Sequence, residues 1–162
     1  MIVEQVFDET IYPNLKTYIE EHNTYSAKVV KVDVQDSNIF PIIPVQLLPD
    51  ITNRYNNLNY GEETYSFGIE INIYAIDKTM QQTVVNNGVS SVVNKKVSKK
   101  TICDEITEMI VNYIKETYHF TDKVTHNAPN ADSNVYRNLI RLNGVLDTKY
   151  GNNNLVIYPT LR

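Results

Sequence analysis

The sequence contains no tryptophan, a single cysteine and five glycines, and its basic side chains are fewer than its acidic ones. Because Cys103 has no partner in the chain, an internal disulfide is excluded, which fits a reducing compartment. Lysine and arginine together number 15 against 19 aspartates and glutamates, giving a formal charge of -4. This balance argues against a dedicated nucleic-acid binder, although not against DNA that merely passes by.

A long apolar run is also lacking, so no segment is expected to span a bilayer. The N-terminal stretch MIVEQVFDET carries acids and no basic region, which is not the pattern of a secretory signal. We therefore expect a protein that does not bind a membrane.

Catalytic motifs are missing as well. The sequence has no GxSxG, Walker-type or GxGxxG motif. The three histidines, His22, His119 and His126, have no partner at metal-ligand spacing. Cys103 lies beside an apolar helical stripe, which favours a packed thiol over a nucleophile. We expect no enzymatic activity, no cofactor and no metal site.

One pair of acids keeps a catalytic alternative open. Pro49-Asp50, followed by Glu70-Ile71-Asn72, resembles the PD…(D/E)xK pattern of metal-dependent nucleases, whose acids hold Mg²⁺ and whose lysine stabilises developing charge. Asn72 stands where the lysine should be and cannot supply that charge. The other interpretation, a loop acid and a charge on the wet face of a sheet, is favoured because such matches are often accidental.

What the chain does have is a length and composition typical of one globular domain, with 162 residues, 42% of them hydrophobic and 21% charged. Tyrosine is frequent, with 12 copies, and asparagine is abundant. Tyrosine favours protein interfaces, but codon bias of a low-GC genome explains the same composition, and both interpretations stay open.

The stretch Tyr65–Asp77, YSFGIEINIYAID, predicts the central strand of a sheet. Its odd positions form an apolar row, and its even positions include Glu70, Asn72 and Tyr74. Since successive side chains of a strand point to opposite faces, one face is predicted to be covered and the other to be wet or to contact another protein.

Two helices are predicted to cover the apolar row. Residues 98–118 have an apolar stripe at helical spacing, with Ser98 or Thr101 as the N-cap. Residues 2–22 have a second stripe, which Pro13 interrupts. We expect either one kinked helix or, preferably, a turn followed by a helix over 11–22.

Further strands are predicted around the central one. The segments 25–35 and 134–146 alternate like strands. The apolar segment 39–48 contains Pro41 and Pro44, so its strand is expected at a sheet edge or to begin near Pro44 or Val45. Residues 49–63 are expected to form a loop, and Leu155–Pro159 a last strand or an extended tail.

Between the central strand and the second helix, residues 79–97 contain two valine-bearing runs around Asn86-Asn87-Gly88. An Asn-Gly pair between such runs is typical of a β-hairpin with a type I′ turn. The segment cannot build its own core, so we interpret it as a projecting hairpin arm. A floppy surface loop is the alternative. Four lysines at its base, Lys95, Lys96, Lys99 and Lys100, favour a solubilising surface over a phosphate site.

The order of helices and strands predicts an α+β fold: a mainly antiparallel sheet covered on one face by two helices, with a projecting β-hairpin arm. We expect a single domain over residues 1–162, in which 79–97 is the arm and 150–162 a C-terminal extension.

Four segments in this order resemble the small tail terminator, or tail-completion, proteins of long-tailed phages, also described as minor capsid or tail-joining proteins. They are the proline-marked strand Phe40–Leu48, the strand ending EINIYAID (Glu70–Asp77), the helix KKTICDEITEMIVNYI (Lys99–Ile114) and NAPNADSNVYRNLIRLNGVLD (Asn127–Asp147). The run from Asn127 to Arg137, followed by Arg141, is the most specific piece. The arm and the extension depart from the family pattern.

The resemblance implies a structural virion protein, found at the head-proximal end of the tail and in the host cytoplasm during assembly. It implies a homo-hexameric ring on the last ring of the tail tube protein, facing a head-completion or neck protein, with DNA passing through the lumen. A head–tail adaptor or stopper of the neck is the nearest alternative.

The residues expected at an interface between subunits come from three places. Strand addition between copies is a common use of exposed hairpins and extensions. Arg137 and Arg141 either bind acids of a neighbour or pair with Glu70 across the sheet. The expected interface residues are Glu70, Asn72, Tyr74, Val84, Val85, Val89, Val92, Val93, Arg137, Arg141, Leu155, Ile157 and Tyr158.

Overall fold

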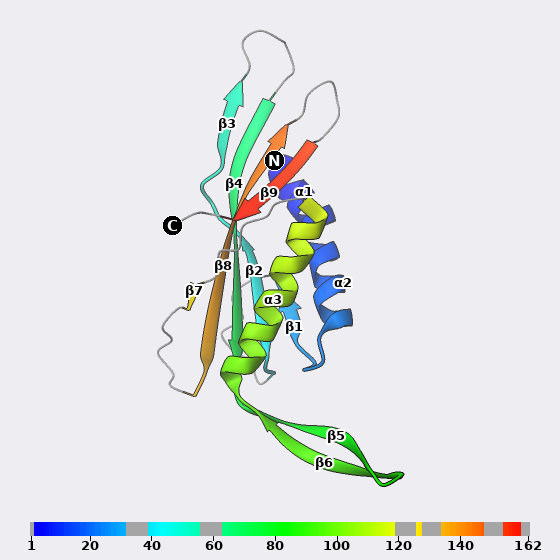
Figure 1. Cartoon of the computed structure of the whole chain (residues 1–162). Coiled ribbons are helices and arrows are strands. Elements are labelled where there is room, and N and C mark those ends of the chain that lie inside the picture. The colour runs from blue at the N-terminus through cyan, green and yellow to red at the C-terminus, as the bar shows by residue number, and fades with distance from the viewer. Residues whose placement is uncertain are drawn as a thin grey trace.

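A seven-stranded sheet carries helices on one of its faces, and a two-stranded hairpin projects from one end (Figure 1). The computed structural model describes residues 2–31, 39–55, 63–118, 126–127, 134–147 and 154–159. Within these residues the sheet consists of β1 (Lys28–Val30), β2 (Ile42–Leu47), β3 (Thr52–Tyr55), β4 (Glu63–Ala75), β7 (His126–Asn127), β8 (Tyr136–Asp147) and β9 (Asn154–Pro159). The fold is α+β, as the sequence predicts.

Strand β4 is the centre of the sheet. It pairs antiparallel with β2, with β3 and, over twelve residue pairs, with β8. From residue 65 to residue 75, its odd-numbered side chains are buried: Tyr65, Phe67, Ile69, Ile71, Ile73 and Ala75. The alternation in the sequence therefore identified the covered face of the sheet correctly.

Helix α3 (Lys99–Tyr118) lies across the covered face (Figure 1). Ile102, Ile106, Ile110 and Ile114 are buried against the sheet at helical spacing. Ser98 caps the helix, because its Oγ accepts a hydrogen bond from the Thr101 backbone N–H at 3.2 Å. Both the helix and the first of its two predicted caps are confirmed.

The N-terminal helix covers the remainder of the same face. Val3, Phe7, Ile11, Leu15 and Ile19 form its buried stripe. Its three parts follow one another without a break: α1 (Ile2–Val6), the π-helical segment η1 (Phe7–Ile11) and α2 (Tyr12–His22).

The preferred prediction of a turn followed by a helix over 11–22 is therefore wrong, and the alternative of one helix is closer. The backbone N–H of Tyr12 bonds to the carbonyl of Phe7, five residues back, and Pro13 follows within the first turn of α2. Inside a continuous α-helix, a proline lacks the N–H of its i→i−4 hydrogen bond, and its ring clashes with the carbonyl four residues back. The wider π-turn therefore lets the helix continue past Pro13.

The position predicted for the strand in segment 39–48 is also wrong, as strand β2 shows. It lies between β1 and β4 and begins at Ile42, so it is neither an edge strand nor delayed to Pro44. The pairs between β2 and β4 skip Ile43 and Pro44, because proline has no N–H to donate to the ladder. Pairing at Ile42 and from Val45 onward holds the strand in place.

Two features of the sheet have no counterpart in the prediction. Strand β1 runs parallel to β2, and β3 lies within the segment 49–63 that was expected to be a loop. Strand β8 occupies almost all of the predicted segment 134–146. The segment Leu155–Pro159, predicted to be a last strand or an extended tail, lies in strand β9. Residues 32–35 of the predicted strand 25–35, and residues 128–133 of the run from Asn127 to Arg137, lie outside the described residues.

Candidate interaction surfaces

The arm is a regular antiparallel hairpin made of β5 (Lys78–Asn86) and β6 (Val89–Val97). Asn86 pairs with Val89, so the turn contains only Asn87 and Gly88. Their positive φ angles of 52° and 80° are those of a type I′ turn. The predicted hairpin is confirmed, and Figure 1 shows it extending away from the sheet.

Valines lie exposed on both faces of the arm. The register places Val84, Val89 and Val93 on one face and Val85 and Val92 on the other. Val84 is half-buried, whereas Val85, Val89 and Val92 are 64%, 67% and 65% exposed and Val93 is 47% exposed. In the described part of the chain no further strand pairs with β5 or β6. The arm thus presents apolar side chains and unpaired backbone edges together.

The root of the arm is tied to the start of α3 and to the segment that follows α2. The Asp77 Oδ1 accepts a hydrogen bond of 2.8 Å from the Lys99 backbone N–H, at the start of α3. That bond is the largest cause of the lowered pKa of Asp77. On the other side, the Lys78 Nζ donates to the carbonyl of Tyr25. These contacts fix where the arm leaves the body.

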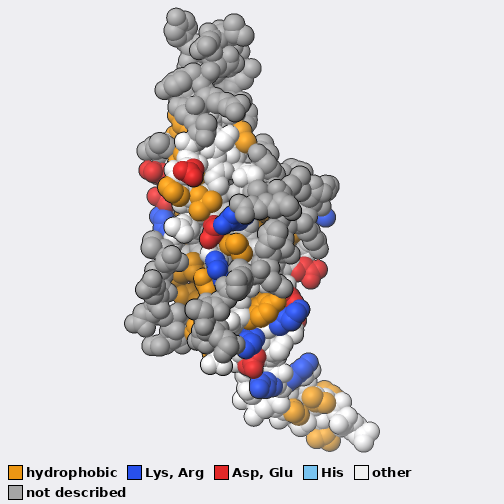
Figure 2. Space-filling view, turned by 90° about the vertical axis from the view of Figure 1, so that its left-hand side faces the viewer, with side chains coloured by type: hydrophobic (Ala, Val, Ile, Leu, Met, Phe, Trp, Pro, Cys, Tyr) orange, Lys and Arg blue, Asp and Glu red, His pale blue; other side chains and the backbone are white. Residues whose placement is uncertain are grey.

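On the face drawn in Figure 2, basic and acidic side chains lie close to one another among apolar ones. On the open face of the sheet, polar side chains of β4 and β8 bond to each other. Asn72 is buried, and its Oδ1 accepts two hydrogen bonds from Arg137, at 2.9 Å from Nε and 2.7 Å from Nη2. The Asn72 Nδ2 donates to Glu70 at 3.2 Å, and Glu70 forms an ion pair with Arg141 at 3.3 Å. The Arg137 guanidinium also lies 5.7 Å from the centroid of the Tyr74 ring.

This polar row joins all five residues that the sequence proposed for the open face. Of the two roles predicted for Arg141, the structure contains the ion pair with Glu70. The bonds between Arg137 and Asn72 were not predicted, because they depend on the register in which Tyr74 pairs with Arg137. The row therefore engages both arginines within one chain, Arg141 through the ion pair with Glu70 and Arg137 through the neutral amide of Asn72, in the arrangement of a cross-strand polar ladder.

The C-terminal strand β9 pairs with β8 of its own chain. Leu155, Ile157 and Tyr158 stand opposite Leu146, Gly144 and Asn143. Their side chains lie outside the described part of the structure. The backbone of this segment thus extends its own sheet.

Asp50 and Glu70, the two acids of the nuclease alternative, lie in different surroundings. Asp50 is exposed after the end of β2, whereas Glu70 lies within the polar row and is engaged by Arg141 and Asn72. No cluster of three or more histidines, cysteines or acids that could hold a metal ion exists among the described residues. Within the same residues, no helix is both long and apolar enough to cross a membrane.

Cys103 is fully buried, and its thiol lies 3.4 Å from the carbonyl oxygens of Ile73 and Tyr136. Burial raises the pKa of this thiol to about 12. The expectation of a packed thiol is confirmed, because a nucleophilic cysteine needs an accessible thiolate.

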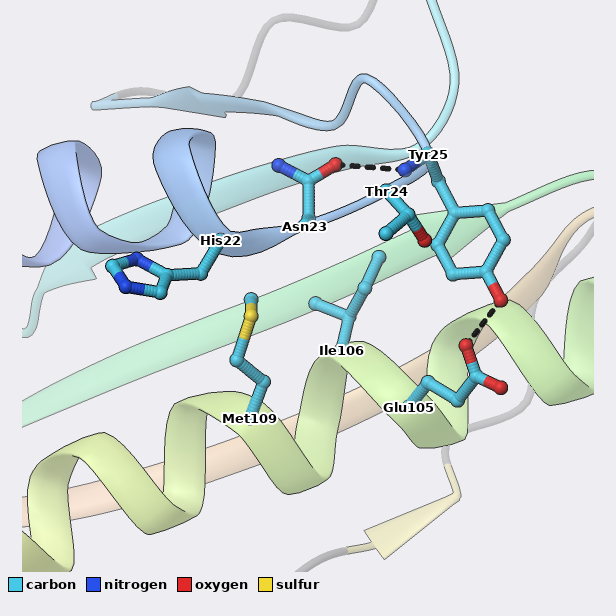
Figure 3. A pocket seen from close by; sticks show the side chains of 7 residues that line it. All are labelled: His22, Asn23, Thr24, Tyr25, Glu105, Ile106 and Met109. Carbon is cyan, nitrogen blue, oxygen red and sulfur yellow. Dashed lines mark hydrogen bonds between the residues drawn. The ribbon is translucent and has the colours of Figure 1, made fainter.

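A pocket of about 300 Å³ lies between the C-terminal end of α2 and the first half of α3 (Figure 3). We call it the Tyr25 pocket. Ile106 and Met109 point into it from α3, and its other lining residues are His22, Asn23, Thr24, Tyr25 and Glu105. Sequence reasoning missed it, because the pocket forms only when two helices distant in sequence pack together.

The polar groups of the Tyr25 pocket are bonded to each other. The Tyr25 hydroxyl donates to Glu105, and the Asn23 Oδ1 accepts from the backbone N–H of Tyr25 and of Ala27 at 3.1 and 2.8 Å. Burial and the neighbouring Glu105 raise the pKa of Tyr25 to about 12, so its hydroxyl stays protonated at neutral pH. The pocket therefore offers mainly apolar contact.

Comparison with known proteins adds no relative: no protein-family model matches the chain, and a search of curated proteins finds no significant match.

Proposed function

We propose that this chain is a non-enzymatic structural subunit of a phage virion. In this role it forms a ring, of six copies by the family resemblance, on the head-proximal end of the tail tube. The ring ends polymerisation of the tube, meets a head-completion or neck protein, and lets DNA pass through its lumen. Two observations support the proposal: the order of segments in the sequence and one feature of the structure, the arm.

The arm supports the proposal because it packs little against the body. The buried core is formed by the helices and the large sheet, and of the arm only Met80 and Val97, near its root, pack against that core. The exposed valines beyond them would be costly in a monomer, since contiguous exposed apolar side chains mark interaction sites. A hairpin with two free edges and an apolar surface suits assembly by contact between copies.

The open face of the sheet supports a structural role in a second way. Its arginines are paired with Glu70 and Asn72 and are not aimed together at an empty site. A formal charge of -4 is also suited to a channel through which DNA slides, because binding to phosphates depends on unpaired basic groups.

Imaging of the assembled particle tests the proposal. We expect density for this chain as a ring between the last ring of the tail tube and the neck. A position within the neck, away from the tube, would instead identify an adaptor or stopper. Absence of the chain from purified virions would contradict both roles.

A further inference from the structure

The arm has two long strand edges that are open in the described part of the chain. Strands β5 and β6 each contain nine residues, and apart from each other neither has a pairing partner there. Figure 1 shows the hairpin standing clear of the large sheet. We propose that the outer edge of β6 in one copy pairs antiparallel with the outer edge of β5 in a second copy. The inference rests on the proposed assembly through the arm and names the two edges that join.

The edges of the arm carry none of the usual protection against pairing. Natural sheets protect an exposed edge with a charge, a proline, a bulge or a very short strand. Residues 79–94 contain no charged residue and no proline, and β5 and β6 pair over nine consecutive positions without a bulge. By contrast, β1 and β7, at the two ends of the strand order of the large sheet, have only three and two residues. The edges of the arm are thus of the kind that another strand joins.

The sequence of the arm favours a second arm as that other strand. Strands β5 and β6 already form a regular antiparallel ladder within one chain. When β6 of one copy lies beside β5 of the next, the same two sequences meet again in the same orientation. The lysines of the two strands, Lys78, Lys95 and Lys96, lie at the root. Residues 79–94 of two arms therefore place no like charges opposite each other, which would destabilise the pairing.

The turn determines which backbone groups face outward. In a β-turn of this kind the carbonyl of the first residue, Asn86, accepts from the N–H of the fourth, Val89. Along an antiparallel pair, positions bonded to each other alternate with positions whose N–H and C=O point away from the partner strand. Counted from the turn, the pair of Thr83 with Val92 is one of the outward-facing positions. Thr83 and Val92 therefore offer backbone groups at opposite edges of the arm.

Pairing between unlike edges can repeat in one direction. Such an interface is heterologous, and it gives a ring when the rotation between copies closes. A closed set of arms has no free edge. Because outward-facing residues must stand opposite one another, Val84, Val89 and Val93 of every copy then lie on one common face. The exposed valines of neighbouring arms thus come side by side.

Proline at an outward-facing position tests each edge separately. Thr83→Pro blocks the edge of β5 and Val92→Pro the edge of β6, whereas the inner ladder is kept, since proline is tolerated where the N–H faces outward. Each variant alone should associate at least about tenfold more weakly than the unchanged chain in sedimentation, because a carbonyl of the partner loses its donor. Thr83→Ala and Val92→Ala keep the N–H and are the matched controls. They should weaken association less than about fivefold.

Mixing the two proline variants distinguishes unlike edges from like edges. Val92→Pro retains the edge of β5 and Thr83→Pro retains the edge of β6, so each offers what the other lacks. The mixture should form a one-to-one complex and nothing larger, because the two edges left over both carry proline. Native mass spectrometry with a mass label on one variant measures the composition. Circular dichroism and urea denaturation check that each variant is folded.

Hydrogen exchange of the unchanged chain provides a second measurement that needs no variant. The backbone N–H groups of Thr83 and Val92 should exchange at least about tenfold more slowly at a concentration where the chain associates than after dilution, since pairing covers them. The N–H groups of Val84 and Ser91 face the inner ladder and should change little.

A dimer formed by Thr83→Pro alone or by Val92→Pro alone would mean that like edges pair, and it would overturn the inference. A mixture of the two that stays monomeric overturns it too, as does exchange at Thr83 and Val92 that does not respond to concentration. An unchanged chain that is monomeric at millimolar concentration has the same consequence. These outcomes are separate from those of the proposed function, since pairing in solution does not depend on where the chain sits in a virion. Pairing without incorporation into virions would retain the contact and reject the tail.

Discussion

Arg137 on β8 donates two hydrogen bonds, from Nε and Nη2, to the side-chain oxygen of Asn72 on the paired strand β4. Asn72 is only 5% exposed, so the acceptor of these bonds is shielded from water. Hydrogen bonds from a charged donor are stronger than neutral ones, and leaving the donor unpaired in a buried place is costly. The pair thus stabilises the register between the two longest strands of the sheet.

Replacing Asn72 with leucine should therefore lower the free energy of unfolding by about 1–3 kcal/mol, because Arg137 loses its acceptor within the sheet. Urea denaturation followed by circular dichroism measures the change. Gln46→Leu is the matched control, since Gln46 is exposed opposite Glu70. We expect that change to stay within about 0.5 kcal/mol. Equal losses in the two variants would show that the polar row contributes no specific stability.

The carboxylate of Asp77 should make stability depend on acid pH. Its pKa is lowered from the ordinary value of 3.8, chiefly by the hydrogen bond from the Lys99 backbone N–H. A depressed pKa in the folded state stabilises the fold above the unfolded value, and this contribution is lost as the pH falls through the folded pKa. Asp77→Asn should therefore destabilise the protein at pH 6 more than at pH 2.

Lys96→Gln is the control for that prediction. Its Nζ lies 3.6 Å from the Asp77 Oδ2 and is largely exposed, so removing it leaves the bond to the Lys99 N–H intact. Most of the pH dependence should remain in this variant. Urea denaturation of the unchanged protein, Asp77→Asn and Lys96→Gln at pH 6 and at pH 2 measures these differences in stability. A Lys96→Gln variant that behaves like Asp77→Asn would assign the effect to the ion pair and not to the start of α3.

How far the sequence predicted this structure depended on how local each signal was. Alternation in 65–77 identified the buried face of β4, and Asn87-Gly88 identified the turn of the arm, because both patterns act over a few neighbouring residues. The continuous helix through Pro13 was the less favoured of two predictions, since the π-turn that accommodates the proline has no sequence pattern of its own.

Contacts between segments that are distant in the chain could not be predicted from the sequence. The parallel pairing of β1 with β2 and the bonds from Arg137 to Asn72 both depend on register, which a single strand does not encode. Five candidate residues of the open face were nevertheless placed together, because their alternation on two strands put them on one side. The Tyr25 pocket left no signal, since its walls are ordinary helical surface until α2 and α3 pack.

Gly144 in β8 is predicted to tolerate no side chain. It pairs with Phe67 of β4, and a methyl group built on Gly144 would lie 2.1 Å from the ring of that phenylalanine. Gly144→Ala should therefore cost about 1–3 kcal/mol of stability, as other overpacked sites do. Gly68→Ala is a milder comparison, because its new methyl would meet the flexible end of Leu48 at 2.9 Å.

Combining Gly144→Ala with Phe67→Leu identifies the cause of that loss. The smaller side chain leaves room for the methyl, so the two changes together should cost less than the sum of their separate effects. Thermal unfolding of the two single variants and the double variant gives the coupling. Strict additivity would mean that Gly144 is required for its backbone and not for its contact with the ring.

Shortening the arm should separate assembly from folding. Removing residues 83–92 and joining Gln82 to Val93 through an Asn-Gly turn keeps the paired register at the root, where Gln82 already faces Val93. The deleted side chains are almost all exposed, so the free energy of unfolding should change by less than about 1 kcal/mol. Met80 and Val97, which pack on the core, are retained.

In sedimentation, the shortened chain should be monomeric at concentrations where the full chain associates, because most of the exposed valines of the arm are gone. A full-length chain with Gln81→Asp serves as the control for handling and charge. If the shortened chain unfolds, the arm belongs to the core. Its exposed valines then have a structural role that the contacts described above do not explain. If it folds and still associates, another surface, such as the open face of the sheet, joins the copies.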